Sequence, residues 1–162
     1  MKKIVIRFNA PVILAFALLS LLALLLGKWT DGAATYQYFS VYRASLSDPL
    51  TYVRFFGHVL GHADYEHYMG NMLLILLVGP GLEEKYGRGT MVWTIAVTAL
   101  VTGLVYFVFF PGSVLLGASG VVFMMIVLSS FTAMRRGEIP ITLILVVIFY
   151  LGGEIMLSLI HI

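Results

Sequence analysis

Ser119 is the residue whose type and surroundings point most directly to chemistry. It lies between Gly117 and Gly120, near the start of an apolar stretch that runs to about Ala133. Glycines have no Cβ, so backbone and a substrate carbonyl can come close to the serine, and amide N–H groups stay accessible. Small residues at this spacing also let membrane helices pack closely. The motif therefore indicates either a nucleophile or a helix contact.

His67 and Asn71 form a second pair of chemical interest. They are four residues apart, so on a helix they share one face and can aim two donors at one point. If Ser119 attacks a peptide carbonyl, the resulting oxyanion needs preorganised donors, and histidine, asparagine and the Ser119 N–H are suitable. The pair alone is weak evidence. Its meaning depends on whether the fold brings it to the depth of Ser119.

The composition predicts an integral membrane protein of one compact unit. Of the 162 residues, 60% are hydrophobic and only 11% are charged. The net charge of +2 comes from scattered basic residues, so no nucleic-acid partner is expected. The absence of cysteine excludes disulfides, thiolate metal sites and cysteine nucleophiles.

Apolar stretches near the ~20 residues that cross a bilayer predict five membrane-spanning helices. The second of them begins with polar residues, and Gly79-Pro80-Gly81 is expected to end it. Residues 28–57 are expected to form a mixed outer loop in which Pro49 prevents a continuous helix. The predicted helices cover residues 10–27, 58–78, 91–110, 114–133 and 139–155.

The distribution of Lys and Arg predicts a cytoplasmic N-terminus. Seven of these residues fall on the N-terminal side of the predicted membrane and three on the other side. With this orientation the histidine-rich start of the second helix and Ser119 both lie near the outer face. Ionisable residues inside a membrane are costly and usually face a cavity, so we predict a functional site there, with a helix-locking polar network as the alternative.

Three segments of the sequence form a larger pattern: His58-x3-His62-x4-His67-x3-Asn71, Gly79-Pro80-Gly81-Leu82-Glu83-Glu84-Lys85-Tyr86-Gly87 and Gly117-Ala118-Ser119-Gly120. Together they resemble the rhomboid family of intramembrane serine proteases. The resemblance covers roughly residues 54–154 and implies an all-α, multi-pass transmembrane bundle of six helices. It also implies that Ser119 is the nucleophile and that His67 and Asn71 contribute to the oxyanion hole. We expect no cofactor.

Three further positions can be compared with the family pattern. Arg54 corresponds to the arginine of a Trp-Arg segment in the first loop, with Val53 replacing the tryptophan. Phe123 stands where the family often has a tyrosine that stacks on the catalytic histidine. Glu83 resembles a glutamate that ties cytoplasmic helix ends together, although Glu83 and Glu84 also suit a solvated charged turn.

The C-terminus departs from the family pattern, in which a histidine of the sixth helix is the general base. Only five helices are predicted, and His161 is the only histidine after Ser119. Residues 157–162 coincide with a translation of the end of a transposase adapter used in sequencing libraries. We therefore expect a truncated rhomboid-like domain over residues 1–156, a non-native tail over 157–162, and no activity from the chain as printed.

His58 and His62 are also four residues apart and suggest a metal site as an alternative. A zinc hydrolase would require His-Glu-x-x-His, but Val59 follows His58. We therefore expect no metal, and we expect both histidines to form hydrogen bonds with the first loop and the helix start.

The function predicted from the sequence is that of an intramembrane serine endopeptidase in the bacterial plasma membrane. Its expected partners are transmembrane protein substrates and the lipid bilayer. A non-proteolytic rhomboid-like protein that binds transmembrane clients is the alternative, but a pure binder has no need of Ser119 together with His67 and Asn71. A transporter or channel would place polar residues at the midplane, whereas here they gather near one end.

Overall fold

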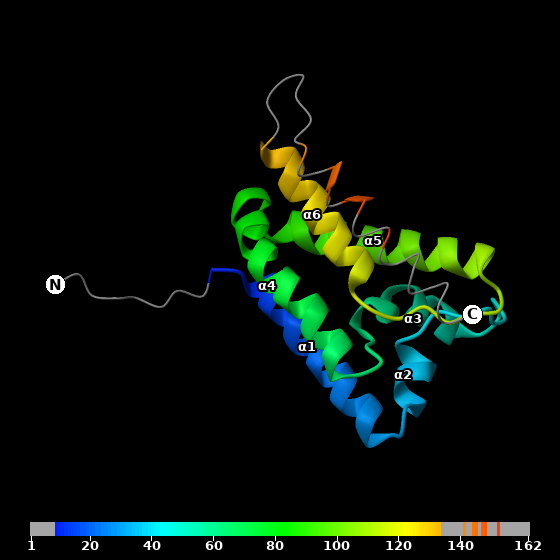
Figure 1. Cartoon of the computed structure of the whole chain (residues 1–162). Coiled ribbons are helices and arrows are strands. Elements are labelled where there is room, and N and C mark those ends of the chain that lie inside the picture. Colours follow the sequence, from blue (N-terminus) through cyan, green and yellow to red (C-terminus); the bar gives the residue numbers. More distant parts are fainter. Residues whose placement is uncertain (1–8, 134–140, 142–143, 146, 149–151, 153–162) are drawn as a thin grey trace.

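The computed structural model describes residues 9–133, 141, 144–145, 147–148 and 152. In this part of the chain the named elements are all helices, which confirms the predicted all-α class (Figure 1). They are α1 (Pro11–Trp29), α2 (Ala33–Tyr38), α3 (Pro49–Gly57), the short 3-10 helix η1 (His58–Leu60), α4 (Tyr65–Tyr86), α5 (Arg88–Phe109) and α6 (Ser119–Ala133).

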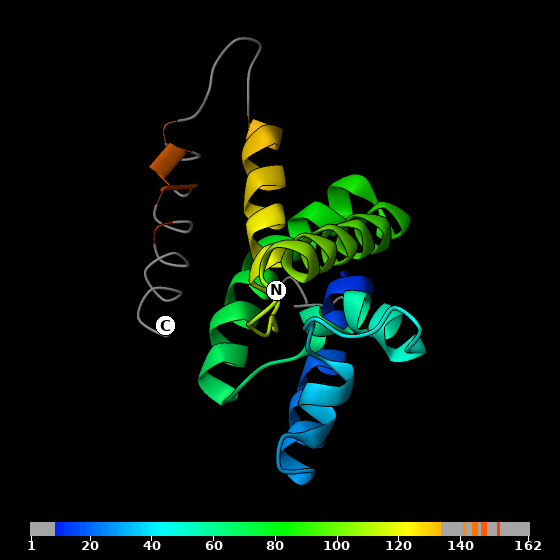
Figure 2. The same ribbon diagram turned by 90° about the vertical axis from the view of Figure 1, so that its right-hand side faces the viewer.

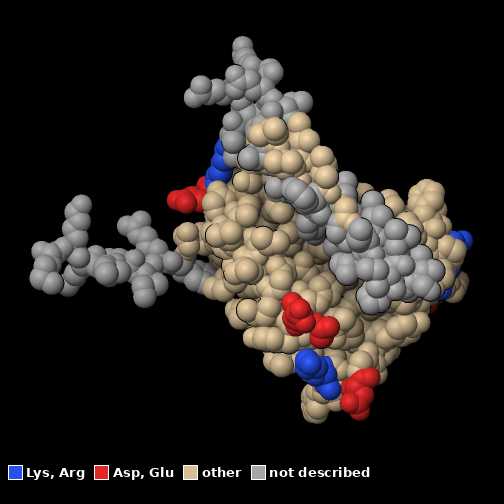
Figure 3. All heavy atoms as spheres, viewed as in Figure 1, with Lys and Arg blue, Asp and Glu red and all other residues tan. Residues whose placement is uncertain are grey.

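The longest apolar helices have the properties of membrane spans. α1 and α5 are long and apolar enough to cross a bilayer, and α6 has a shorter apolar stretch over Ser119–Phe131. Large apolar side chains such as Leu77 and Trp93 are exposed, at 75% and 69%. Figure 3 shows a face on which charged side chains are few and uncharged atoms predominate. Such a surface suits lipid better than water.

α1 and α4 pack side by side and run in opposite directions, since the Glu83 carboxylate near the end of α4 meets the start of α1 (Figures 1 and 2). The shared core includes the fully buried residues Ile13, Ile75 and Met72. This core extends to α5 and α6.

The prediction that Gly79-Pro80-Gly81 ends the second helix is wrong. α4 continues through these residues to Tyr86. A Cβ at Gly79 would lie 2.7 Å from Ile13 Cδ1, so this glycine serves close packing against α1. Pro80 removes one backbone donor, but membrane helices tolerate such interior prolines.

The second helix also begins later than predicted, at Tyr65 instead of residue 58. Asp64 caps it by accepting a hydrogen bond from the His67 N–H at 2.7 Å. Before this cap the chain is extended at Gly61, where a Cβ would collide with the Phe39 carbonyl oxygen. His58 and His62 therefore lie outside the membrane-spanning helices.

The loop predicted over residues 28–57 contains two helices, α2 and α3. α3 begins at Pro49, and its cap Asp48 accepts from the Leu50 N–H. Arg54 is 4% exposed and holds this region together. Its Nε donates to the Gln37 carbonyl at 2.9 Å and its Nη1 to Asp48 at 3.1 Å, while the guanidinium lies over the Tyr42 ring.

The fourth predicted helix begins at Ser119 instead of residue 114. The fifth, over 139–155, lies largely outside the described residues, although residues 141, 144–145, 147–148 and 152 have helical backbone. Also outside the described residues are Lys2, Lys3, Arg7, Arg135, Arg136, His161 and the predicted tail 157–162.

Candidate active site

The segment before Ser119 is held by backbone hydrogen bonds to the first loop. Val41 and Leu115 exchange two of them, both 2.8 Å long, as an isolated antiparallel bridge. The Gly117 N–H donates to the His58 carbonyl at 2.9 Å. These bonds place the Gly117 backbone next to the start of α4.

Gly117 lies directly against the predicted oxyanion pair. A Cβ at this position would be 2.8 Å from both Cε1 and Nε2 of His67, and 3.9 Å from Nδ2 of Asn71. Its φ of +123° is also one that side chains rarely allow. Both facts require glycine. The side of the chain two residues before Ser119 thus faces His67, with Asn71 next to it.

The pair itself is fixed by α4. Asn71 is 8% exposed, and its Nδ2 donates to the His67 carbonyl at 3.2 Å, one turn earlier. The second Nδ2 hydrogen remains available for another acceptor. The predicted sharing of one helical face by His67 and Asn71 is consistent with their common contact with Gly117.

Ser119 is the first residue of α6. The amide N–H groups of a first helical turn project from the N-terminus, where the helix dipole stabilises negative charge. Gly120 faces the other side, because a Cβ there would be 3.1 Å from Cγ2 of Thr102 on α5. Gly120 therefore allows α6 to pack closely against α5, which is the helix contact predicted as the alternative role of the motif. Phe123, one turn on, lines a cavity of about 400 Å³ between α5 and α6.

His62 adjoins the site without lying on α4. It is 1% exposed, and its ring centroid lies 5.0 Å from that of His67 and 5.5 Å from that of Tyr68. Its Nδ1 is 3.1 Å from the Leu60 carbonyl, so this nitrogen carries the hydrogen. Burial, helped by repulsion from His67, lowers the pKa of His62 to about 4, so the ring is neutral at physiological pH.

His58 has hydrogen-bond partners at both ring nitrogens, which is typical of a structural role. Its Nδ1 is 3.2 Å from the Arg54 carbonyl, and its Nε2 is 3.2 Å from the Thr102 hydroxyl. Burial lowers the pKa of His58 to about 4. The predicted bonding is confirmed: His58 bonds Arg54 of the predicted first loop, and His62 bonds Leu60 in the predicted helix start. The contact with Thr102 was not predicted, because a threonine in an apolar span carries no signal in the sequence.

No group of three or more His, Asp or Glu side chains that could hold a metal ion occurs among the described residues. Both ring nitrogens of His58 have hydrogen-bond partners, His62 has one at Nδ1 while its buried Nε2 has none among the described residues, and Asp64 is used as a helix cap. The described chemistry is therefore that of a serine, an amide and imidazoles.

Comparison with known families agrees with this arrangement. The family model described as Rhomboid domain matches residues 49–161, well over half of the 162-residue chain. Comparison with curated proteins finds no match. The matched region includes α3 to α6 and thus Ser119, His67, Asn71 and the contact made by Gly117. Because the family model matches most of the chain, including α3 to α6, the chain belongs to the rhomboid family.

Proposed function

We propose that this integral membrane protein is a serine endopeptidase that cleaves peptide bonds in or beside transmembrane segments. The observation that carries the proposal is that Gly117, two residues before Ser119, leaves open the space beside His67 and Asn71 that a side chain would fill. A glycine of this kind lets a substrate carbonyl approach two donors and a hydroxyl together. Membership of the rhomboid family supports the same activity.

In the proposed reaction the Ser119 hydroxyl adds to the scissile carbonyl and loses its proton to a base. The carbonyl oxygen becomes an oxyanion, which accepts hydrogen bonds from the His67 ring, the Asn71 amide and the first-turn N–H of α6. Collapse breaks the C–N bond, and the leaving amine takes the proton from the base. Water then hydrolyses the acyl ester and restores the serine.

We assign the base to none of the three described histidines. His58 is bonded at both ring nitrogens, and burial lowers the pKa of His62 to about 4, which makes its ring a weak proton acceptor. His67 is assigned to the oxyanion. His161 is the remaining histidine of the sequence and can be tested directly.

The orientation that we propose has the N-terminus in the cytoplasm and Ser119 near the outer face of a bacterial plasma membrane. It rests on the excess of Lys and Arg that the sequence predicts on one side of the membrane. Of these residues, Lys85 in the last turn of α4 and Arg88 at the start of α5 lie at the same end as the start of α1, because Glu83 joins these two places. Substrates therefore reach the site from the outer leaflet.

The activity can be tested in liposomes that contain a transmembrane substrate. The 162-residue chain and the full product of the genomic reading frame that encodes it are each compared with their Ser119→Ala variants. Ser113→Ala is the matched control, because Ser113 is an exposed serine in the segment that leads to Ser119. We expect cleavage by the genomic product that Ser119→Ala abolishes and Ser113→Ala leaves intact.

Two further results are informative. Loss of cleavage in a His161→Ala variant of the 162-residue chain would make His161 the base and contradict its assignment to a non-native tail. Folded protein that retains transmembrane clients but never cleaves them would refute the protease and favour a client-binding protein.

A further inference from the structure

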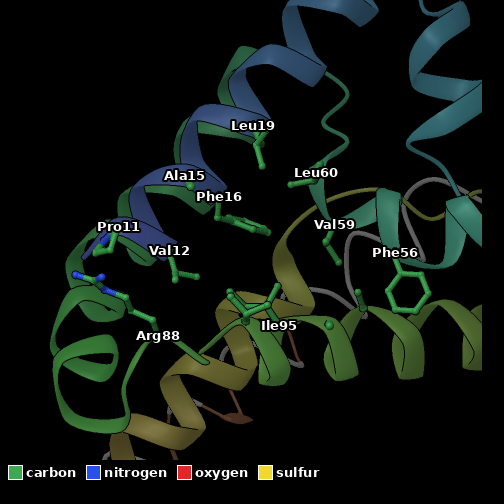
Figure 4. A pocket seen from close by; sticks show the side chains of 13 residues that line it. Pro11, Val12, Ala15, Phe16, Leu19, Phe56, Val59, Leu60, Arg88 and Ile95 are labelled. Atoms are coloured by element: carbon green, nitrogen blue, oxygen red, sulfur yellow. The ribbon is translucent and has the colours of Figure 1, made fainter. Parts of the chain in front are cut away.

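A cavity of about 520 Å³ lies away from the candidate active site, between α1, the α3–η1 segment and α5 (Figure 4). Its walls are apolar except for one side chain, Arg88. Figure 4 shows that Arg88 lies at the end where Pro11 and Val12 begin α1, and that Phe56 and Leu60 lie farther along. The cavity is therefore an apolar space with a cation at one end.

The cavity opens to the membrane side of the bundle. Three of its apolar lining residues are about half exposed: Leu19 at 51%, Phe56 at 47% and Val92 at 55%. Deeper in, Phe16, Val59 and Ala99 are buried and form its floor. A hydrocarbon chain that enters from the membrane gains dispersion contacts with these walls, which an empty cavity would lack.

Arg88 has no counter-ion within the described part of the chain. No carboxylate of that part lies within 4.0 Å of its guanidinium, and the ion pair found there joins Arg54 to Asp48. The nearby buried acid, Glu83, already accepts the Val12 and Ile13 N–H groups. Guanidinium presents donors in a fork that matches phosphate oxygens, so an anionic phosphate complements this end of the cavity.

The length of the cavity suits one lipid leaflet. Arg88 and Ala99 both line it, and eleven residues of helix separate them, or about 16 Å. Half of a bilayer's hydrocarbon core is about 15 Å. A phosphate at Arg88 would therefore lie at the membrane surface while an acyl chain reaches the level of Ala99 near the midplane.

We propose that this cavity is a binding site for one anionic glycerophospholipid, with its phosphate on Arg88 and one acyl chain between α1 and α5. The lipid would join the α1 start to α5, a pair of helices that is separated by the cavity for much of its length. The preference for an anionic headgroup follows from Arg88, since a zwitterionic lipid brings its own cation to the phosphate.

The test uses the 162-residue chain in detergent and mass spectrometry of intact lipid complexes. The probes are phosphatidylglycerol and phosphatidylethanolamine with the same palmitoyl and oleoyl chains. We expect the wild-type protein to bind one phosphatidylglycerol at least about tenfold more tightly than Arg88→Gln does. Lys85→Gln, which removes a cation from the same turn region but not from the cavity, should bind like wild type.

Two filling variants test the acyl-chain part of the proposal. Ala96→Phe and Ala15→Phe place a ring in the cavity from opposite walls, and each should abolish the tight complex. Ala15 is exposed, so its substitution leaves the packed core unchanged. The proposal fails if Arg88→Gln keeps wild-type affinity, if phosphatidylethanolamine binds as tightly as phosphatidylglycerol, or if a folded Ala15→Phe variant still binds tightly.

Discussion

At the scale of single residues, Gly117 links two distant parts of the chain. Its positive φ lets the segment before α6 turn, and the missing Cβ lets that segment touch His67 and Asn71. The same residue donates its N–H to the His58 carbonyl. The position of Ser119 relative to the oxyanion pair therefore depends on a glycine that itself takes no part in the proposed chemistry.

The oxyanion assignment predicts a loss of rate without a loss of fold. Removing one such donor typically lowers turnover about a hundred- to a thousand-fold. We therefore expect His67→Ala and Asn71→Ala to lower cleavage of a transmembrane substrate by this factor. Met69→Ala is the control, because Met69 is exposed on α4 between the two residues. Cleavage kinetics and circular dichroism of the purified variants provide the measurements.

Near wild-type rates in folded variants would contradict this role. Loss of the folded state would instead support the alternative in which the pair is a helix-locking polar network. The Asn71 side chain donates a hydrogen bond to the His67 carbonyl, so a structural role of Asn71 can be measured separately, as loss of the folded state in Asn71→Ala.

The buried histidines of the η1 region predict that acid destabilises the protein. His58 and His62 have folded-state pKa values of about 4, below the ordinary histidine value of about 6.5. Between these values only the unfolded chain takes up the protons, so stability is full above about pH 6.5 and falls as the pH drops towards 4. At about pH 5 each histidine should cost roughly 2 kcal/mol.

The check is the unfolding free energy at about pH 7.5 and about pH 5 for the wild-type protein and for His58→Gln and His62→Gln. Each variant should lose less stability on acidification than the wild-type protein does. An unchanged dependence on pH in both variants would show that other groups titrate.

At the scale of elements, the start of α1 is completed by a residue seventy positions away in sequence. Glu83 is 3% exposed and accepts from the Val12 N–H at 3.1 Å and the Ile13 N–H at 2.9 Å. These are first-turn amides that have no partner within their own helix. A carboxylate there also meets the positive end of the helix dipole, so one side chain fixes the register of α1 against α4.

This contact predicts different effects from two adjacent glutamates. Glu83→Ala leaves two α1 amides without their acceptor and should lower the unfolding free energy by about 1–3 kcal/mol. Glu84→Ala is the matched control, because Glu84 is exposed, and its effect should lie within about 0.5 kcal/mol. Thermal or chemical unfolding in detergent measures both. Equal effects of the two substitutions would show that Glu83 does not stabilise α1.

The helices that the sequence predicts well are those whose limits come from apolar length. The first helix was expected over residues 10–27 and runs from Pro11 to Trp29, and the third was expected over 91–110 and runs from Arg88 to Phe109. The limits of α4 were missed, since they depend on tertiary contacts. Gly79 packs on Ile13 and does not form a turn. The cap at Asp64 starts the helix after the polar residues 58–63, which were expected to belong to it.

The candidate site, like the helices, was predictable where a local sequence pattern marks it and not where tertiary contacts form it. The spacing of His67 and Asn71 and the glycines around Ser119 carry a recognisable pattern, and the structure brings Gly117 to the pair. The hydrogen bond of His58 to Thr102 and the bridge between Val41 and Leu115 join segments more than forty residues apart. No local pattern encodes such contacts, because each partner is an ordinary residue in its own segment.

At the scale of the whole molecule, the described polar groups gather at two ends of an apolar bundle. One end holds the α4–α5 junction with Lys85 and Arg88, next to the start of α1. The other holds α2, α3, the histidines and the start of α6, joined by the Val41–Leu115 bridge and the Gly117 N–H. The sequence assigns five further Lys and Arg residues to the side of Lys85 and Arg88, so the positive-inside rule predicts that the candidate site lies at the outer face.

This orientation can be measured with single cysteines, because the 162-residue sequence has none. Ser47→Cys introduces a thiol between α2 and α3, and Glu84→Cys introduces one beside the α4–α5 junction; both positions are exposed. In intact bacterial cells we expect a membrane-impermeant maleimide to label Ser47→Cys, and to label Glu84→Cys only after the membrane is opened. The reverse pattern would place Ser119 at the cytoplasmic face, so that substrates would have to approach from inside. Labelling of both thiols in intact cells would mean that the junction between α4 and α5 is not separated from the candidate site by the bilayer, and the spanning roles of α4 and α5 would then be wrong.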